Sequence, residues 1–437
     1  MGVSNPWTEY LQFLPSTVLV PTLWTEDERL LLRGTSLEAA VDAKVSALDA
    51  EFAVVRERSE ELPAWRELLW GEGGVEFTDW MRLDGLYRSR CLELPRAGEA
   101  MVPCVDMVNH AAVPSAYYDE SGRGDDVVLL PRPGVGGKKG EEVMISYGAD
   151  KSAAEMLFSY GFIDAQHAAP TSSNGLVLPL SPFPDDPLAK AKLVAFGEAP
   201  KIHVARDAGT TATDRGEDGG ENGSSGGGSI QWHSPFAYLM CVNEEDGLEF
   251  RVLQQTDGAR SRLRVFWLGE DVTDRTSSFE ALVDAHPMAA LLRLRVATVV
   301  LERLHEQLGR LGEGTEPDPA DVAAAGGLER RQECVAAAAL LRQVETGLLE
   351  QAVEKLEEEA SLHTSIPPYL PLPPLPHLHT HPCGHARKQK KKRVTLQHTP
   401  SPIHHPAPSQ KDNHSPSRCL PAMPRPACMH ACTDRSG

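Results

Sequence analysis

The sequence lacks any uninterrupted run of about 18 apolar residues, so no transmembrane helix is expected. Its eight cysteines lie far apart and none forms a Cys-x-x-Cys pair, whereas disulfide frameworks belong to short secreted chains. The N-terminus, MGVSNPWTEYLQFLP, has no basic segment followed by an apolar core and is not typical of a secretory signal. These absences favour an intracellular, reducing compartment and leave chloroplast, cytoplasm and nucleus open.

Basic residues are outnumbered, with 43 Lys and Arg against 62 Asp and Glu in 437 residues, which gives a formal net charge of -19. A chain that coats nucleic acid needs a basic footprint, so this balance argues against nucleic acid as the main partner. The one dense basic stretch, RKQKKKR at 387–393, is either a nuclear-import or polyanion-binding patch or a solvated charge run.

The pattern along the chain predicts an α+β protein in four parts. Residues 1–95 read as mainly helical, with helices expected over 36–60 and 78–90 and an N-cap at Thr25. Residues 96–165 carry short strands at 127–130 and 143–145, then a helix over 152–160 that Gly161 ends. Residues 166–360 are mainly helical, with strand-like pieces near 250–269, a disordered insertion at 205–229 and strong helices over 287–311 and 327–359. Residues 361–437 are a disordered Pro- and His-rich tail.

The stretch MVPCVDMVNH, residues 101–110, raises a question because an apolar strand-like run closes on polar groups that are costly to bury without partners. A turn that uses Asn109 to satisfy local backbone is one reading. A metal site built from Cys104, Asp106 and His110 is another: alternation along a strand puts Cys104 and Asp106 on one face, but His110 lies beyond the expected end of the strand. No metal is predicted here, nor at the Cys/His segments of the tail, whose spacing matches no standard zinc finger.

Three polar clusters in order resemble the SET-domain protein methyltransferases, in the branch of the Rubisco large-subunit lysine methyltransferase. Pro103, Asp106, Asn109 and His110 match the branch pattern PxxDxxNH. Residues 140–162 match GExxxISYG followed by KSxAExLxxYGF. Ser89-Arg90 matches a Ser-Arg at the end of a helical insert, and residues 1–95 resemble that insert. The part from 166 to 360 is similar to the branch's substrate-binding domain.

The resemblance implies a protein-lysine N-methyltransferase that uses S-adenosyl-L-methionine (AdoMet), with a protein as substrate and no membrane partner; it leaves the oligomeric state open. It implies that Tyr147 is the catalytic residue. Cofactor contacts are expected from Asn109, His110, Arg90, Tyr147 and Phe162. Substrate contacts are expected from Asp106, Tyr117, Tyr118, Tyr160 and Arg90.

The chain also departs from the branch. The Gly-x-Gly strands that begin such SET domains are not found ahead of the insert, so part of the cofactor pocket is expected to be missing. Leu94 stands where Rubisco-modifying members have a basic residue, and Leu92 stands where actin-histidine enzymes have Asn. The alternatives to a lysine methyltransferase are therefore an inactive SET-like scaffold and a protein-histidine methyltransferase.

Overall fold

The computed structural model describes residues 7–121, 126–135, 137–169, 172, 174–206, 229–253, 262–313 and 330–364. The predicted disorder of the tail lies outside these residues except at 361–364, where the prediction is wrong because these residues continue a long helix. The predicted disorder of the insertion also lies outside the described residues except at its ends. Ala205 and Arg206, which the prediction placed in the insertion, end a strand. The predicted α+β class is confirmed, and the strands form five small sheets rather than a closed barrel within the described ranges.

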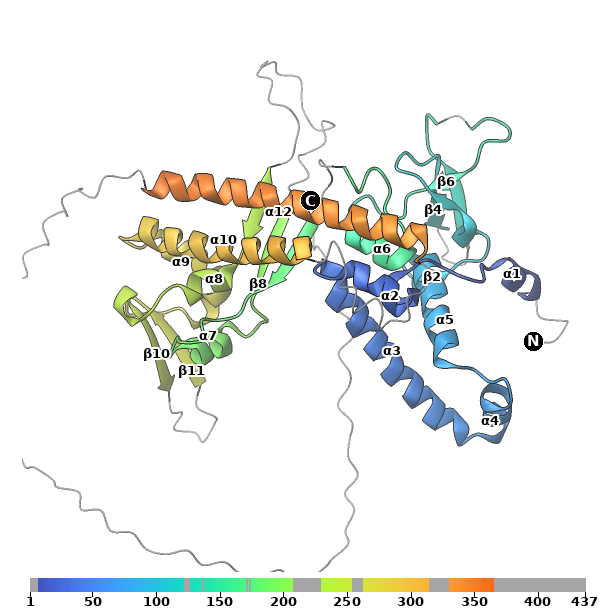
Figure 1. Ribbon diagram of the computed structural model, residues 1–437, viewed down its shortest axis with the longest axis horizontal. Helices are drawn as coiled ribbons and strands as arrows, with labels where there is room; N and C mark the ends of the chain where they lie inside the picture. The colour runs from blue at the N-terminus through green and yellow to red at the C-terminus, as the bar shows by residue number, and fades with distance from the viewer. Residues whose placement is uncertain are drawn as a thin grey trace, which may run out of the picture. The chain divides into compact units, whose positions relative to one another are not determined.

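Helices dominate up to residue 90 (Figure 1). Thr25 is the N-cap of α2 (Glu26–Arg29), as predicted. It forms a capping box with Glu28, in which each side chain accepts a hydrogen bond from the other residue's backbone N–H. The predicted 36–60 helix is confirmed, and it buries one stripe of residues spaced by four or seven, on one face of the helix. The elements are α1 (Thr8–Phe13), 3-10 turns at Pro21–Leu23 and Leu30–Leu32, α2 (Glu26–Arg29), α3 (Ser36–Glu60), α4 (Pro63–Trp70) and α5 (Phe77–Arg90).

Short strands follow directly. Antiparallel pairs join β1 (Cys91–Leu94) to β2 (Gly98–Met101) and β4 (Ala116–Glu120) to β5 (Val127–Pro131). A parallel pair joins β3 (Asn109–His110) to β6 (Met144–Ile145), with Asn109 opposite Met144 and His110 opposite Ile145. Helix α6 (Ala153–Tyr160) comes next, and Gly161 ends it in the left-handed conformation with φ +82°, as the sequence predicts.

The expectation of one strand through 101–110 is wrong. Strand β2 ends at Met101, and a 3-10 turn over Val105–Met107 precedes β3. Cys104 has φ +76°, a left-handed conformation that breaks the extended run. Asp106 consequently lies in a turn, and Asn109 and His110 are the residues that pair as a strand. Because this segment is not a strand, alternation does not place Cys104 and Asp106 on one face.

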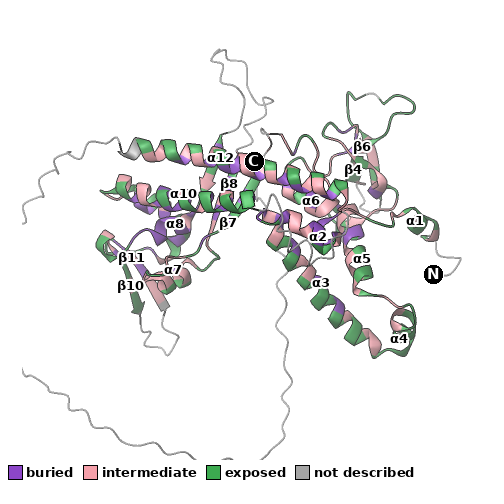
Figure 2. Ribbon diagram, viewed as in Figure 1, coloured by how far each residue is buried: buried purple, intermediate pink, exposed green. Residues whose placement is uncertain are grey.

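The C-terminal part has the main apolar core, where the sheet β7-β8-β9 and helices α8, α9, α10 and α12 pack together (Figures 1 and 2). Its strands are β7 (Gly175–Pro179), β8 (Lys201–Arg206), β9 (Ile230–His233), β10 (Leu248–Leu253), β11 (Arg262–Trp267) and β12 (Glu270–Asp271). Its helices are α7 (Ala189–Phe196), α8 (Pro235–Met240), α9 (Phe279–Asp284), α10 (Ala289–Glu313) and α12 (Gln332–Thr364), with 3-10 turns at Glu244–Asp246 and Thr273–Ser278.

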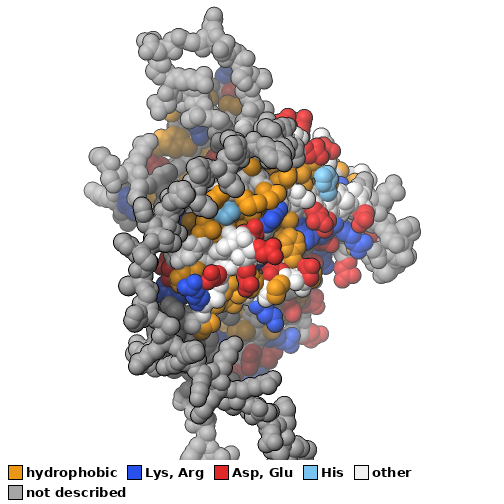
Figure 3. Space-filling view, turned by 90° about the vertical axis from the view of Figure 1, so that its left-hand side faces the viewer, with side chains coloured by type: hydrophobic (Ala, Val, Ile, Leu, Met, Phe, Trp, Pro, Cys, Tyr) orange, Lys and Arg blue, Asp and Glu red, His pale blue; other side chains and the backbone are white. Residues whose placement is uncertain are grey.

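Helix α12 connects this core to the N-terminal helices. Its long apolar stripe packs against α10, and its N-terminal half contacts α6. Just before it, Arg331 pairs with Glu28, and within it Glu345 accepts from the backbone N–H of Ser36 at the start of α3. No helix in the described ranges is long and apolar enough to cross a membrane. On the face drawn in Figure 3, acidic, basic and hydrophobic side chains are intermixed.

Candidate active site

Four rings meet beside the β3–β6 pair. The ring centroids of Tyr147 and Tyr160 are 4.6 Å apart, and those of Tyr147 and His110 are 5.2 Å apart. Phe162 lies 6.3 Å from Tyr147 and 6.0 Å from His110. The parallel pairing places His110 beside Ile145, two residues before Tyr147. The other two rings, Tyr160 and Phe162, flank Gly161, which ends α6 in the left-handed conformation. The structure thus brings together the predicted residues of two separate motifs.

Every polar group of Tyr147 has a hydrogen-bond partner. Its hydroxyl donates to the backbone oxygen of Val108 at 2.9 Å, and its N–H donates to Nδ1 of His110 at 3.1 Å. Its carbonyl oxygen accepts from the Tyr160 hydroxyl at 3.3 Å. Burial raises the pKa of the Tyr147 phenol, Arg90 acts in the opposite direction, and Asp106 adds to the rise. Tyr147 is therefore a neutral phenol in a fixed orientation.

The paired residues of β3 already have protein partners. The Nδ2 of Asn109, which is exposed, donates to Oε1 of Glu142 at 2.6 Å. Both ring nitrogens of His110 are also used: Nδ1 accepts from Tyr147, and Nε2 lies 2.8 Å from Oδ2 of Asp164. His110 therefore offers a ligand its ring face and backbone rather than a ring nitrogen. Contact of either residue with AdoMet stays a prediction.

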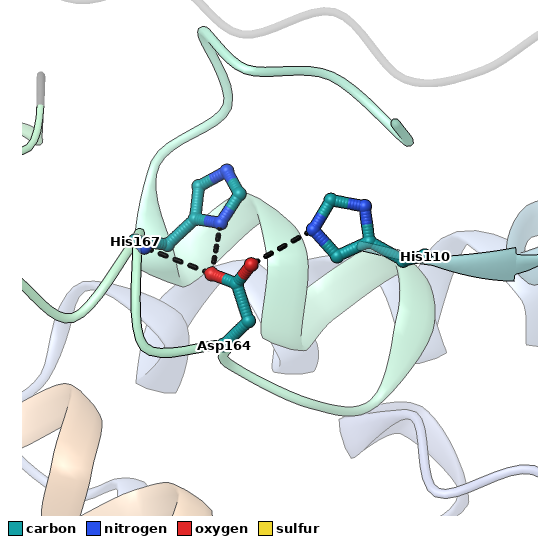
Figure 4. Close-up of side chains that lie close together, drawn as sticks. All are labelled: His110, Asp164 and His167. Carbon is teal, nitrogen blue, oxygen red and sulfur yellow. Dashed lines mark hydrogen bonds and ion pairs between the residues drawn. The ribbon is translucent and has the colours of Figure 1, made fainter. Parts of the chain in front are cut away.

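Asp164 and His167, which the sequence analysis did not single out, lie next to His110. Asp164 lies between the rings of His110 and His167 and contacts both (Figure 4). The backbone N–H of His167 donates to Oδ1 of Asp164 at 2.8 Å, and its Nε2 lies 3.1 Å from the carbonyl oxygen of Gly148. We call His110, Asp164 and His167 the His–Asp–His bridge. The position of Asp164, two residues after Phe162, was the only local signal for it.

Arg90 and Asp106 form an ion pair. Nη1 of Arg90 donates to the Asp106 backbone oxygen at 3.0 Å and lies 3.4 Å from Oδ2. The hydroxyl of Tyr10, from α1, donates to the same Oδ2 at 2.8 Å. The Asp106 side chain is 0% exposed, and its Oδ1, like Nε of Arg90, is buried without a partner among the described residues. Sequence reasoning missed Tyr10 because 96 residues separate it from Asp106.

Tyr117 and Tyr118, the two tyrosines of β4, have different surroundings. Because side chains alternate along a strand, they point to opposite faces. Tyr118 packs in the apolar cluster that includes Tyr147, and its hydroxyl lies 3.5 Å from the Glu93 oxygen. Tyr117 is on the other face and is 37% exposed. The geometry therefore favours Tyr118 over Tyr117 as a residue of the site.

A cavity of about 600 Å³ lies away from the rings, between α12 and the segment around Asn174. Arg206, Arg342 and Gln351 are among its lining residues, and none of the lining residues belongs to the ring cluster. The two places connect through Asn174, whose Nδ2 donates to the backbone oxygen of His167 at 2.7 Å. The residues that the motifs predicted for the site thus lie at the ring cluster and not in this cavity.

Comparisons with known proteins show which proteins this chain resembles. No family model matches the chain. It is 27% identical over 293 residues to "SET domain-containing protein 8" of Schizosaccharomyces pombe, covering 67% of this chain and 60% of that protein. It is 26% identical to the chloroplastic ribulose-1,5 bisphosphate carboxylase/oxygenase large subunit N-methyltransferase of Nicotiana tabacum, covering 38% of this chain and 34% of that enzyme. The chain thus spans less than two thirds of the length of either relative.

Solved structures show the same fold. The SET domain of LSMT, bound to MeLysine and AdoHcy, aligns with a TM-score of 0.55 at 18% identity, covering 83% of this chain and 73% of that one. The resemblance found in the sequence motifs is therefore confirmed by both kinds of comparison. The homologues of this chain are SET domain-containing proteins and Rubisco large-subunit methyltransferase-like enzymes, and its fold is that of their SET-domain structures.

Proposed function

We propose that this chain is an AdoMet-dependent N-methyltransferase that acts on a lysine side chain of a protein. The observation that carries the proposal is the orientation of the Tyr147 hydroxyl. Because this hydroxyl donates to the Val108 carbonyl at 2.9 Å, its oxygen is left as an acceptor. A neutral lysine amine has N–H groups to donate to that oxygen, and its lone pair then points elsewhere, free to attack a methyl group.

The surroundings suit an amine that must arrive uncharged. Burial raises the pKa of Tyr160 to about 12, and the pKa of Tyr147 is raised for the same main reason, so both phenols stay neutral at physiological pH. They orient the amine and line its path, and neither acts as a base. A dry, apolar wall disfavours an ammonium relative to an amine. Aromatic faces also attract methylated ammonium and sulfonium groups.

The residues present fit the cofactor. Nε of Arg90 is a buried donor and Oδ1 of Asp106 a buried acceptor, and neither has a partner among the described residues. An amino-acid end, with one carboxylate and one ammonium, would satisfy both. Asn109 and the ring face of His110 would hold the rest. AdoMet, when bound, supplies an electrophilic methyl on its sulfonium.

The packing of Leu92 supports lysine over histidine as the substrate, whereas Leu94 bears on whether the substrate is Rubisco. Leu92 is 7% exposed and Leu94 is 4% exposed, and both pack in the apolar cluster beneath the β1–β2 pair. A site for an imidazole needs a polar partner for its second ring nitrogen, and a core leucine offers none. The proposal for a lysine substrate therefore gains support from the packing as well as from the motifs.

The test uses the full chain. Calorimetric titration with AdoMet measures binding, and methyl-labelled AdoMet with a lysine-containing peptide library measures transfer, read as methyllysine by mass spectrometry. We expect binding, label on lysine, and turnover about 100-fold lower in Tyr147→Phe with AdoMet affinity nearly unchanged, since orientation of the amine is lost. Tyr87→Phe, at an exposed tyrosine of α5, serves as the matched control and should behave as wild type.

Three results would count against the proposal. Folded protein that gives no heat at millimolar AdoMet would favour the inactive scaffold. Label recovered as methylhistidine would favour the histidine enzyme. Equal turnover of Tyr147→Phe and wild type would remove Tyr147 from the reaction.

A further inference from the structure

We infer that Asp164 and His167 are positioning residues for Tyr147, acting through a His–Asp–His bridge in which His110 is a neutral imidazole and His167 an imidazolium. The role assigned to Tyr147 rests on the proposed function. The arrangement of protons in the bridge does not, because it follows from hydrogen-bond partners alone.

The His110 ring has one proton. Its Nδ1 lies 3.1 Å from the backbone nitrogen of Tyr147, which can only donate, so Nδ1 must be unprotonated. Its Nε2 lies 2.8 Å from Oδ2 of Asp164, which as a carboxylate can only accept, so Nε2 carries the proton. The backbone of Tyr147 therefore selects the tautomer of His110.

The His167 ring has two protons. Its Nε2 lies 3.1 Å from the carbonyl oxygen of Gly148, which only accepts, and its Nδ1 is in short contact with Oδ1 of Asp164. His167 is 2% exposed, so water does not substitute for either partner. Burial raises the pKa of Asp164, but hydrogen bonds from His167 and His110 lower it by more, and the carboxylate stays ionised. The bridge is thus an ion pair of Asp164 and His167 to which neutral His110 donates.

The same three side chains lie close enough to suggest a metal site, since one ligand atom from each lies within 4.8 Å of the others. The hydrogen bonds oppose that reading. The only lone pair of the His110 ring accepts from Tyr147, so binding a metal through Nε2 would require an imidazolate. Each ring also faces a different oxygen of Asp164 (Figure 4). The geometry therefore points to a hydrogen-bonded bridge.

The bridge holds the backbone at Tyr147 and at Gly148, the residue after it. One ring accepts from the N–H of Tyr147, and the other donates to the carbonyl of Gly148, whose φ of +135° requires glycine. The regular backbone pairing of β3 with β6 ends at Ile145. Two residues further on, the side chain of His110 accepts the hydrogen bond from the backbone N–H of Tyr147. Asn174 in turn holds the His167 backbone oxygen at 2.7 Å. Loss of the bridge should free the Tyr147 backbone and misdirect its hydroxyl.

The protonation pattern is tested by nitrogen NMR on the full chain with ¹⁵N-labelled histidine. His110→Gln and His167→Gln assign the two rings among the 16 histidines, and His305→Gln, on the exposed face of α10, is the control. We expect one protonated and one bare ring nitrogen in His110, and two protonated nitrogens in His167. A bare Nδ1 in His167, or a stoichiometric zinc complex that His167→Gln abolishes, would overturn the bridge.

Positioning is tested by turnover and by the ring signal of ¹³C-labelled Tyr147. In Asp164→Asn we expect kcat to fall on the order of 10- to 100-fold with KM for AdoMet unchanged, and the Tyr147 signal to shift. His167→Gln, which keeps a donor near the Gly148 carbonyl, should lose less than His167→Asn. An unshifted Tyr147 signal together with wild-type kcat in Asp164→Asn would refute positioning.

The two proposals fail separately. If wild type binds and transfers nothing while the protonation pattern and the Tyr147 shift are as expected, the proposed function is wrong and the bridge stands. If wild type transfers methyl groups but the pattern is absent, the bridge is wrong and the proposed function stands.

Discussion

The ion pair of Glu28 and Arg331 gives a stability prediction whose size follows from the structure. Glu28 is 1% exposed, and its Oε2 lies 2.6 Å from Nη2 of Arg331. Hydrogen bonds from Arg331, with a smaller contribution from the Thr25 backbone, lower the pKa of Glu28 from 4.5 to about 2, against the opposing effect of burial. The difference between a pKa of 4.5 and one of about 2 corresponds to about 3.4 kcal/mol, because a tenfold change in the dissociation constant corresponds to about 1.36 kcal/mol. This pair ties α2 to the start of α12.

The sign follows from the depressed pKa. Stability from Glu28 is fully present above its unfolded pKa of 4.5 and is lost as the pH falls through about 2. Glu28→Gln keeps a capping residue but removes the charge, so it isolates this contribution. We expect it to lower the free energy of unfolding by about 3 kcal/mol at pH 7 and by only about 1.4 kcal/mol at pH 3.

The assay is urea unfolding, monitored by circular dichroism, because an uncharged denaturant does not screen the ion pair. Glu26→Gln, an exposed carboxylate in the same turn, is the matched control and should cost little at either pH. The reasoning is refuted if Glu28→Gln and Glu26→Gln cost the same at pH 7, or if the cost of Glu28→Gln does not shrink between pH 7 and pH 3.

Three further predictions concern other parts of the chain. Asn109→Ala should weaken AdoMet binding about fivefold in calorimetry, as expected for the loss of one hydrogen bond, and unchanged affinity would exclude Asn109 from the pocket. Gly161→Ala should lower the melting temperature more than Gly197→Ala: both have φ near +80°, but a Cβ at Gly161 would lie 2.7 Å from the Leu19 carbonyl carbon, whereas Gly197 faces open space. Lys192→Met should cost about 3–5 kcal/mol because it leaves Asp186 unpaired, and adding Asp186→Asn should recover part of that loss; no recovery would mean that the pair is not the cause.

Periodicity predicted the helices well because it encodes a local requirement, one apolar stripe on one face. The 36–60 helix matches α3 at both ends, and the 327–359 prediction overlaps most of α12. The same reasoning failed over 101–110, where an apolar run suggested a strand. There a left-handed Cys104 and a 3-10 turn interrupt the run. The local sequence signals neither feature, because the left-handed conformation is expected only at residues such as glycine and asparagine.

The motifs predicted the identity of several site residues, but they did not predict the hydrogen-bond partners of these residues. The motifs that hold Asn109, His110, Tyr147 and Tyr160 resemble those of SET-domain methyltransferases, and that resemblance implied a methyl-transfer site. That Tyr147 donates its hydroxyl proton to Val108, and that Asp164 joins two histidines, depends on segments 39 and 54 residues apart meeting in space.

The sequence by itself thus determined the helices, their caps and the chemical types of the site residues. These depend on spacings of a few residues, which fix local backbone energies and the face that each side chain shares. Only the tertiary structure decided that Tyr118 rather than Tyr117 faces the rings, that Tyr10 reaches Asp106, and which hydrogen bonds orient Tyr147. Those outcomes depend on how distant segments pack against one another, and no local spacing specifies that packing.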